Sequence, residues 1–270
     1  MTTETIDDAV SRVNASTRQP VLFIHGLWLK PSSWDRWAEM FDAAGYSALA
    51  PGWPAEVGGA AAPETIGEVA AHFARIAEAL DRRPAIVGHS FGGLIAQILA
   101  GRGVSAATVA IDPAPFRGVL PLPISALRSA WPVLQNPANA GREVRLTPGQ
   151  FRYAFANAVA EQESEALYQA YQAPAPGRPV FQAAAANLNP WTEARVDTEA
   201  PRRGPLLMIS GERDHTVPPS LTRAAYERQR RNRLAITEFV QLPGRGHSLT
   251  VDSGWREVAE TALAFIGRFV

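Results

Sequence analysis

The sequence predicts an α/β protein, with a mostly parallel sheet of about six core strands flanked by helices. Short apolar runs bounded by turn residues alternate with segments of helical periodicity, the pattern of βαβ units around a parallel sheet. Between Asp112 and Pro205 this alternation stops, and 12 of the 22 prolines fall in that stretch. A chain of 270 residues could form one or two domains, and the interruption favours one core with a helical cap inserted after Asp112.

The first predicted strand, 21–24, consists of four apolar residues and ends at a His-Gly pair. A helix is predicted from Ser32, because Asp35 follows at the capping-box position and apolar residues recur on one face. The next strand is predicted over 46–50. These elements form the first βαβ unit.

Two further strands are predicted over 84–87 and 107–111. Before them, a loop rich in proline and glycine (51–63) leads to apolar residues at helical spacing over 66–80. The apolar segment 94–100 between the two strands is predicted as a helix.

The insertion is predicted to be helical and to contain no strand. Thr147 begins a Thr-Pro-Gly-Gln sequence with an N-cap residue, proline at the first helical position and Gln150 at the capping-box position. Further helices are predicted around 167–171 and over 181–188. A structureless loop of this length would be unusual inside a compact fold.

The chain is predicted to return to the core with strands over 206–209 and 236–240, followed by a closing helix over 255–269. Only about 20 mostly polar residues precede the first strand, so six core strands are predicted and the presence of a strand before Val21 is left open. The predicted organisation is an N-terminal extension (1–19), an α/β core (20–112 and 204–270) and the cap (113–203).

Composition excludes several classes of function. The chain has 26 basic and 26 acidic residues, so no net charge favours nucleic acid or a membrane surface as a partner. It has no cysteine, which excludes thiolate nucleophiles and cysteine-bound metal. No signal peptide and no apolar run of membrane-spanning length are recognised. We expect a soluble, cytoplasmic protein that needs no metal or organic cofactor.

Gly88-His89-Ser90-Phe91-Gly92 lies between a predicted strand and a predicted helix. This is a G-x-S-x-G nucleophile elbow in the context it requires. The tight turn strains the serine backbone and leaves no room for side chains at the two glycines. The turn also places the Ser90 hydroxyl at a helix N-terminus, where a developing oxyanion is favoured.

A serine hydroxyl needs a general base to remove its proton and an acid to orient that base. Asp214 follows the strand predicted over 206–209, and His247 follows the strand over 236–240. Both fall at the carboxyl ends of strands, where catalytic groups gather in open parallel sheets. The order Ser, Asp, His is the one expected for this elbow.

With these motifs in place, the chain resembles the α/β-hydrolase superfamily over residues 20–112 and 204–270. The resemblance rests on His25-Gly26, the elbow, the G-x-x-D-x-x-V-P pattern at 211–218 and the G-x-G-H pattern at 244–247. It implies a mobile cap after Asp112. It also implies the following site: Ser90 as nucleophile, His247 as base and then acid, Asp214 as orienting acid, and the backbone N–H groups of Leu27 and Phe91 as the oxyanion hole.

Other assignments stay open at this stage. Asp112 is an alternative acid, because some superfamily members place their acid after this strand. His215 is an alternative base next to Asp214, whereas His25 and His89 are expected to be structural and His72 partly exposed. Pocket residues are predicted at the following positions: Trp28, Phe91, Trp131 and Val217.

The function predicted from these residues is a serine hydrolase of the carboxylesterase or lactonase type. It would cleave a carboxylic ester, lactone or related acyl compound through an acyl-enzyme on Ser90. The expected partner is a small-molecule substrate, apolar or aromatic in part, and the oligomeric state is left open. Two alternatives remain: a cofactor-independent lyase or oxygenase that uses Ser90 and His247 as an acid–base pair, or a non-catalytic ligand-binding protein on the same fold.

Overall fold

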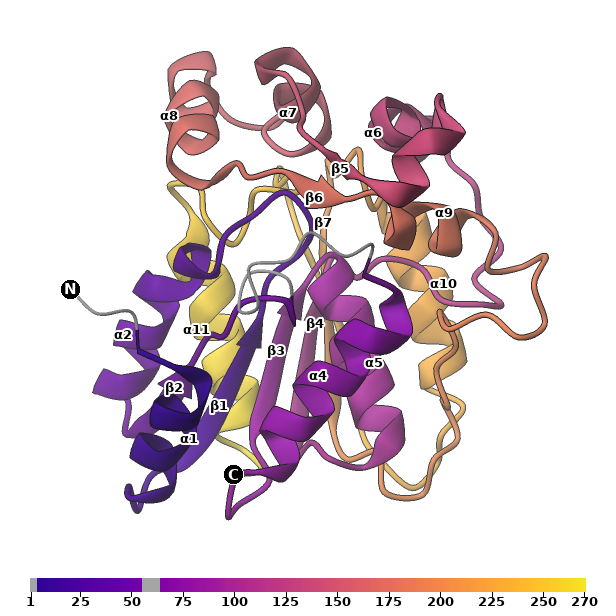
Figure 1. Cartoon of the computed structure of the whole chain (residues 1–270). Helices are drawn as coiled ribbons and strands as arrows, with labels where there is room; N and C mark the ends of the chain where they lie inside the picture. The colour runs from indigo at the N-terminus through magenta and orange to yellow at the C-terminus, as the bar shows by residue number, and fades with distance from the viewer. Residues whose placement is uncertain (1–3, 55–63) are drawn as a thin grey trace.

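The computed structural model describes residues 4–54 and 64–270, and its centre is a parallel sheet of six strands in the order β2-β1-β3-β4-β7-β8 (Figure 1). The predicted α/β class and the six core strands are confirmed. The strands are β1 (Gln19–Ile24), β2 (Tyr46–Leu49), β3 (Ala85–His89), β4 (Ala107–Ile111), β7 (Leu206–Gly211) and β8 (Thr237–Leu242).

Helices cover both faces of the sheet, because successive strand residues point to opposite sides. In β1, Leu22 and Ile24 pack into one apolar cluster, and Val21 and Phe23 pack into the other. The first cluster includes residues of α1, α4, α5 and α10, and the second includes residues of α2 and α11 (Figure 1). These helices are α1 (Ile6–Asn14), α2 (Asp35–Ala43), α4 (Ile66–Glu78), α5 (Phe91–Arg102), α10 (Pro219–Gln229) and α11 (Trp255–Ile266). Among the described helices, none has the length and apolar character needed to cross a bilayer.

Near the N-terminus, one local prediction needs correction and one helix is added. Ser32 is not a helix N-cap: it lies inside a 3₁₀ turn, Pro31–Trp34, and α2 then begins at Asp35 without a side-chain cap. The N-terminal extension contains α1, whose N-cap Thr5 accepts a hydrogen bond from the backbone of Asp8. The sequence signal for α1 is the helical spacing of its apolar residues. Residues 55–63 of the predicted loop lie outside the described residues.

The insertion carries four helices in the described chain, and they lie over the carboxyl ends of the strands (Figure 1). They are α6 (Ile124–Leu134), α7 (Pro148–Ala154), α8 (Glu161–Tyr171) and α9 (Arg178–Ala184), and a 3₁₀ turn at Pro137–Gly141 follows α6. The capping box at α7 forms as predicted, with Thr147 and Gln150 bonded reciprocally.

Three features of the insertion differ from the prediction. The helix expected over 181–188 is α9, which begins and ends earlier. Helix α6 was not expected, because Pro132 inside it obscures the helical pattern. The expectation of no strand is wrong, since β5 (Glu143–Val144) and β6 (Ala175–Pro176) form a short antiparallel pair. Each has only two residues, too few for a recognisable alternation.

A buried arginine fixes the point where the chain returns to the core. Arg203 has no exposed surface, and its guanidinium donates to the carbonyl oxygens of Gln229, Ala235 and Ile236. It also donates to the hydroxyl of Thr237 at the start of β8. Burial lowers the pKa of Arg203 to about 10. The side chain thus closes the end of α10 and the loop that leads into β8.

Candidate active site

Ser90 occupies a strained turn between β3 and α5. Its φ is 57° and its ψ is −121°, and its backbone N–H donates to the Ile111 carbonyl at 2.9 Å. A Cβ atom on Gly92 would lie 2.0 Å from the Ile24 carbonyl oxygen, and one on Gly88 would lie 2.1 Å from the Gly92 carbonyl oxygen. The two glycines of the elbow are therefore required by the close approach of β1, β3 and α5.

The structure brings Ser90, His247 and Asp214 together, although they come from three separate loops. His247 Nε2 lies 3.0 Å from Ser90 Oγ, and His247 Nδ1 lies 2.6 Å from Asp214 Oδ2. All three residues are buried, with His247 fully excluded from solvent. This is the serine–base–acid arrangement expected from the sequence.

Asp214 is held in place by the backbone that follows it. Its Oδ1 accepts hydrogen bonds from the N–H groups of Thr216 at 2.6 Å and Val217 at 2.8 Å. The other oxygen is left for His247. Because a carboxylate only accepts, its contact with Nδ1 assigns the proton of neutral His247 to Nδ1 and leaves Nε2 free to accept from Ser90.

The insertion contributes directly to the position of His247. Phe155, which ends α7, packs its ring edge-on against the His247 imidazole, with 4.8 Å between the ring centroids. The Phe155 carbonyl accepts a hydrogen bond from Ser248 N at 2.9 Å. The position of His247 is therefore supported by the insertion as well as by the core.

The two N–H groups expected to form an oxyanion hole lie on either side of Ser90 in the fold. Leu27 follows Gly26, where an added Cβ would lie 2.7 Å from Ser90 Cβ, and Phe91 begins α5. Within residues 4–54 and 64–270, neither of these two N–H groups donates to another residue. Both donors are thus left free next to the Ser90 hydroxyl.

The loop that carries Leu27 is tied to the insertion through Trp28. This residue has a φ of 62°, and its indole N–H donates to the Val144 carbonyl at 2.9 Å. Its own carbonyl accepts from Ala173 N at 3.1 Å. Two hydrogen bonds therefore link the residue after Leu27 to β5 and to the segment that follows α8.

Asp112 and His89 form a buried polar group behind the site, which the sequence did not predict. Asp112 Oδ1 accepts from Gly211 N at 2.8 Å, and its backbone has a positive φ of 39°. Burial raises the pKa of Asp112 well above its usual value, and the negative charge of the nearby Asp214 raises it further. The surroundings of Asp112 thus favour its protonated form, and it is Asp214 that contacts His247.

His89 is fully buried, with its ring centroid 4.6 Å from that of His247. Burial lowers the pKa of His89 well below its usual value, and the neighbouring His247 lowers it further. His89 is therefore neutral. One atom each from His89, Asp112 and His247 lie within 4.8 Å of one another, the one such grouping of possible metal ligands in the described chain. Both ring nitrogens of His247 already have partners, so this group does not fit a metal site.

The remaining histidines have other contacts. His215 Nδ1 lies 3.1 Å from the Tyr153 carbonyl, so this ring is directed away from Asp214. His25 Nδ1 lies 2.9 Å from the Gly26 carbonyl, within the loop that carries Leu27. His72 was expected to be partly exposed, but it is buried, and its Nε2 lies 3.2 Å from the Gly52 carbonyl.

A cavity of about 390 Å³ opens onto Ser90 and is lined mainly by apolar side chains. Trp28, Phe91 and Val217 line it, as the sequence suggested. Trp131 does not, because α6 turns Ala126, Ala130 and Leu134 toward the cavity and leaves Trp131 exposed to solvent. Small residues of α9 also line it (Ala183 and Ala184), and no sequence signal distinguishes these from other alanines.

The family model of the alpha/beta hydrolase family matches residues 21–261, which is most of the chain. The chain belongs to the alpha/beta hydrolase family. The loop that carries Leu27, the Ser90 elbow and the Asp214 and His247 loops all fall inside the matched region. A search of curated proteins found no match.

Solved structures of alpha/beta hydrolases share the fold at low sequence identity. A monoacylglycerol lipase from Paleococcus ferrophilus matches with a TM-score of 0.63 and 20% identity, covering 91% of this chain and 94% of the lipase. A thermophilic esterase from Thermogutta terrifontis matches with a TM-score of 0.66 and 16% identity, covering 94% of this chain and 91% of the esterase. A pyrethroid hydrolase from Sphingobium faniae matches with a TM-score of 0.65 and 17% identity, covering 92% of this chain and 97% of the pyrethroid hydrolase. These similarities extend over both the core and the insertion.

Proposed function

We propose that this protein is a serine hydrolase that cleaves a carboxylic ester, lactone or related acyl compound through an acyl-enzyme on Ser90. The observation that carries the proposal is the continuous chain of contacts from Ser90 Oγ to His247 at 3.0 Å and from His247 to Asp214 at 2.6 Å. A serine becomes a nucleophile when a base within hydrogen-bond reach removes its proton and an acid orients that base. These three side chains satisfy both conditions.

In the acylation step, Ser90 Oγ attacks the carbonyl carbon of the ester while His247 Nε2 takes the hydroxyl proton. The carbonyl oxygen becomes an oxyanion that accepts hydrogen bonds from Leu27 N–H and Phe91 N–H. Collapse of the tetrahedral intermediate breaks the bond to the leaving oxygen, and His247 returns the proton to it. The products of this step are the free alcohol and an acyl group esterified to Ser90.

In the deacylation step, a water molecule takes the place of the alcohol. His247 Nε2 removes a proton from the water as its oxygen attacks the acyl carbon, and the same two N–H groups bind the second oxyanion. The intermediate releases Ser90 Oγ, which regains its proton from His247. The carboxylic acid leaves and the enzyme returns to its starting state.

The cavity supports an acyl or leaving group that is largely apolar. Its volume of about 390 Å³ lies within the range of small-molecule sites, roughly 300–1,000 Å³. Ser90 and Thr216 provide two of its few polar side chains, so hydrogen bonding can fix little more than the reacting carbonyl. The printed names of the structural neighbours, a lipase, an esterase and a pyrethroid hydrolase, agree with such a substrate.

The proposal is tested with a fluorophosphonate and with a series of activated esters of increasing chain length. We expect the fluorophosphonate adduct on the peptide that contains Ser90, and a pre-steady-state burst of the leaving alcohol from the esters. Ser129→Ala is the matched control, since Ser129 is the other serine in the cavity lining. It should keep the adduct and the burst, whereas Ser90→Ala should lose both.

The outcomes also separate the alternatives. A Ser90 adduct with no burst and no turnover on any ester, lactone or thioester would favour the lyase or oxygenase. Tight, saturable binding of an ester that stays intact would favour a ligand-binding protein. Either result overturns the hydrolase proposal.

A further inference from the structure

Large apolar side chains that face solvent are concentrated in the insertion. In the described chain, seven of the ten exposed large hydrophobic side chains lie between residues 120 and 191. Leu188 and Trp191 are each 87% exposed, so no part of the chain that the structure describes packs over them. We call six of these residues the apolar rim: Leu120, Leu122, Ile124, Trp131, Leu188 and Trp191. A concentration of this kind marks an interaction surface.

The apolar rim lies at the mouth of the cavity that contains Ser90. Leu120, Leu122 and Leu188 line that cavity and are also exposed to solvent. Helix α6 continues the surface, with Ile124 84% exposed on its outer side. Its one charged residue, Arg128, stacks over a tyrosine ring at 4.0 Å. A helix that is apolar around most of its circumference is normally buried, so α6 lacks a covering partner.

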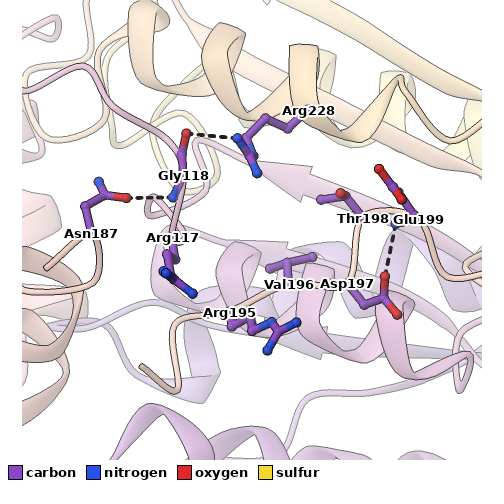
Figure 2. Close-up of a pocket in the computed structure, with 9 residues that line it drawn as sticks. All are labelled: Arg117, Gly118, Asn187, Arg195, Val196, Asp197, Thr198, Glu199 and Arg228. Carbon is purple, nitrogen blue, oxygen red and sulfur yellow. Dashed lines mark hydrogen bonds between the residues drawn. The ribbon is translucent and has the colours of Figure 1, made fainter. Parts of the chain in front are cut away.

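An arginine-lined hollow of about 460 Å³ is shown in Figure 2, and it shares Asn187 with the lining of the catalytic cavity. It contains Arg117, Arg195 and Arg228, and within the described residues none of the three forms an ion pair with a carboxylate. Arg228 Nε is buried and has no hydrogen-bond partner. Figure 2 shows Asp197 and Glu199 on the opposite side of the hollow from Arg117.

The apolar rim and the hollow share a wall. Asn187 lines both the hollow and the catalytic cavity, and its side chain accepts from Gly118 N at 2.6 Å and donates to the Val119 carbonyl at 2.8 Å. Arg117 Nη1 donates to the Pro190 carbonyl at 3.2 Å, next to Trp191. The segments 117–122 and 187–195 thus run together, with arginines on one side and large apolar side chains on the other.

We propose that the apolar rim docks on a phospholipid surface, with lipid phosphates bound by the arginines of the hollow. Tryptophan suits the boundary between water and lipid, and arginine binds phosphate through paired hydrogen bonds. A protein partner on the apolar rim would block the route to Ser90. A lipid surface covers the same side chains and leaves the cavity facing the lipid.

A docked protein could take an ester from the lipid surface into the cavity that contains Ser90. This second step rests on the proposed hydrolase function. The expectation of no membrane partner came from the net charge of the whole chain. Net charge does not describe a local patch, and the sequence alone did not show that these side chains are exposed together.

The experiment is co-sedimentation with vesicles of phosphatidylcholine, with and without phosphatidylglycerol, using the full chain with Ser90→Ala so that no lipid is cleaved. We expect binding that strengthens with phosphatidylglycerol. Ile124→Ser with Trp191→Ser should weaken binding by about tenfold or more, since two large apolar side chains no longer enter the lipid. Leu234→Ser is the matched control, because this leucine is 74% exposed and lies outside the apolar rim, and it should bind as before.

A second pair of variants tests the hollow. Arg195→Gln should remove most of the gain from phosphatidylglycerol, whereas Arg233→Gln, at another exposed arginine, should keep it. Circular dichroism and thermal melting check that each variant is folded.

Absence of vesicle binding by the parent chain, or an equal loss in the Leu234 control, overturns the proposal. So does a dimer in sedimentation velocity that dissociates on the double substitution, because the apolar rim would then join two copies. Since binding is measured without catalysis, a failed hydrolase assay leaves this result intact, and an active hydrolase that ignores vesicles refutes the docking alone.

Discussion

Asp112→Asn is expected to stabilise the protein, and the gain should grow as the pH rises. In the native state the pKa of Asp112 is raised by burial and by Asp214, whereas in the unfolded chain it has its ordinary value of 3.8. Between those two pKa values the native protein holds a proton that the unfolded chain has lost. The free energy of unfolding therefore falls with rising pH over this window, and below it the full stability is present.

The expected magnitude follows from this linkage. While Asp112 stays protonated in the native state, its contribution to the free energy of unfolding falls by about 1.4 kcal/mol per pH unit. Asparagine is neutral at every pH, and its carbonyl oxygen can still accept from Gly211 N. Above the unfolded pKa, and until the pH reaches the native pKa, the difference between Asp112→Asn and the parent should thus increase by about 1.4 kcal/mol for each pH unit.

Urea unfolding at pH 5, 6 and 7 measures this difference, with m-values compared to verify two-state behaviour. Asp81→Asn, at an exposed position, is the matched control and should change the stability by less than about 0.5 kcal/mol. If the difference in the free energy of unfolding between Asp112→Asn and the parent is the same at all three pH values, the reasoning is refuted. The pKa of Asp112 would then not be raised by its surroundings in the native state.

Four further outcomes are expected. Gly92→Ala places a Cβ 2.0 Å from the Ile24 carbonyl oxygen, so it should cost about 3 kcal/mol and lower the Tm by roughly 6–12 °C; an unchanged melting curve would contradict the packing. Arg203→Met leaves buried carbonyl oxygens without donors and should cost about 3 kcal/mol in urea unfolding, with an unshifted midpoint as the contrary result. Thr147→Ala should cost about 1 kcal/mol and speed hydrogen exchange in α7, while Thr147→Ser should not. Asp214→Asn should lower kcat on an activated ester by about 10⁴ with little change in KM, and a drop below tenfold would argue against its role.

The core could be predicted from the sequence because its signals are local. Each of these signals depends on only a few neighbouring residues: the apolar runs predict β3 and β4, and the glycines around Ser90 predict the tight turn. The grouping of His89 with Asp112 could not be predicted, since it depends on the register that pairs His89 with Ile111 across two strands. The raised pKa of Asp112 depends on the burial of its carboxyl group, which results from the same strand pairing.

The insertion was harder to predict, because its elements are short and their packing decides their roles. Residues 130 and 131 are neighbours on α6, yet Ala130 lines the cavity and Trp131 faces solvent. The helical repeat places them about 100° apart, but only the docking of α6 beside α9 determines which one points inward. The apolar rim was missed for the same reason.

The link through Trp28 bears on how this protein could be re-engineered. Its indole N–H and its carbonyl connect the loop that carries Leu27 to Val144 and Ala173, which belong to the insertion. Grafting a foreign segment in place of 113–203 would therefore disturb the N–H groups that we propose as oxyanion donors, as well as the shape of the pocket. A successful graft would need an acceptor where the Val144 carbonyl lies and a donor where Ala173 N lies. Selectivity and rate cannot be exchanged independently in this chain.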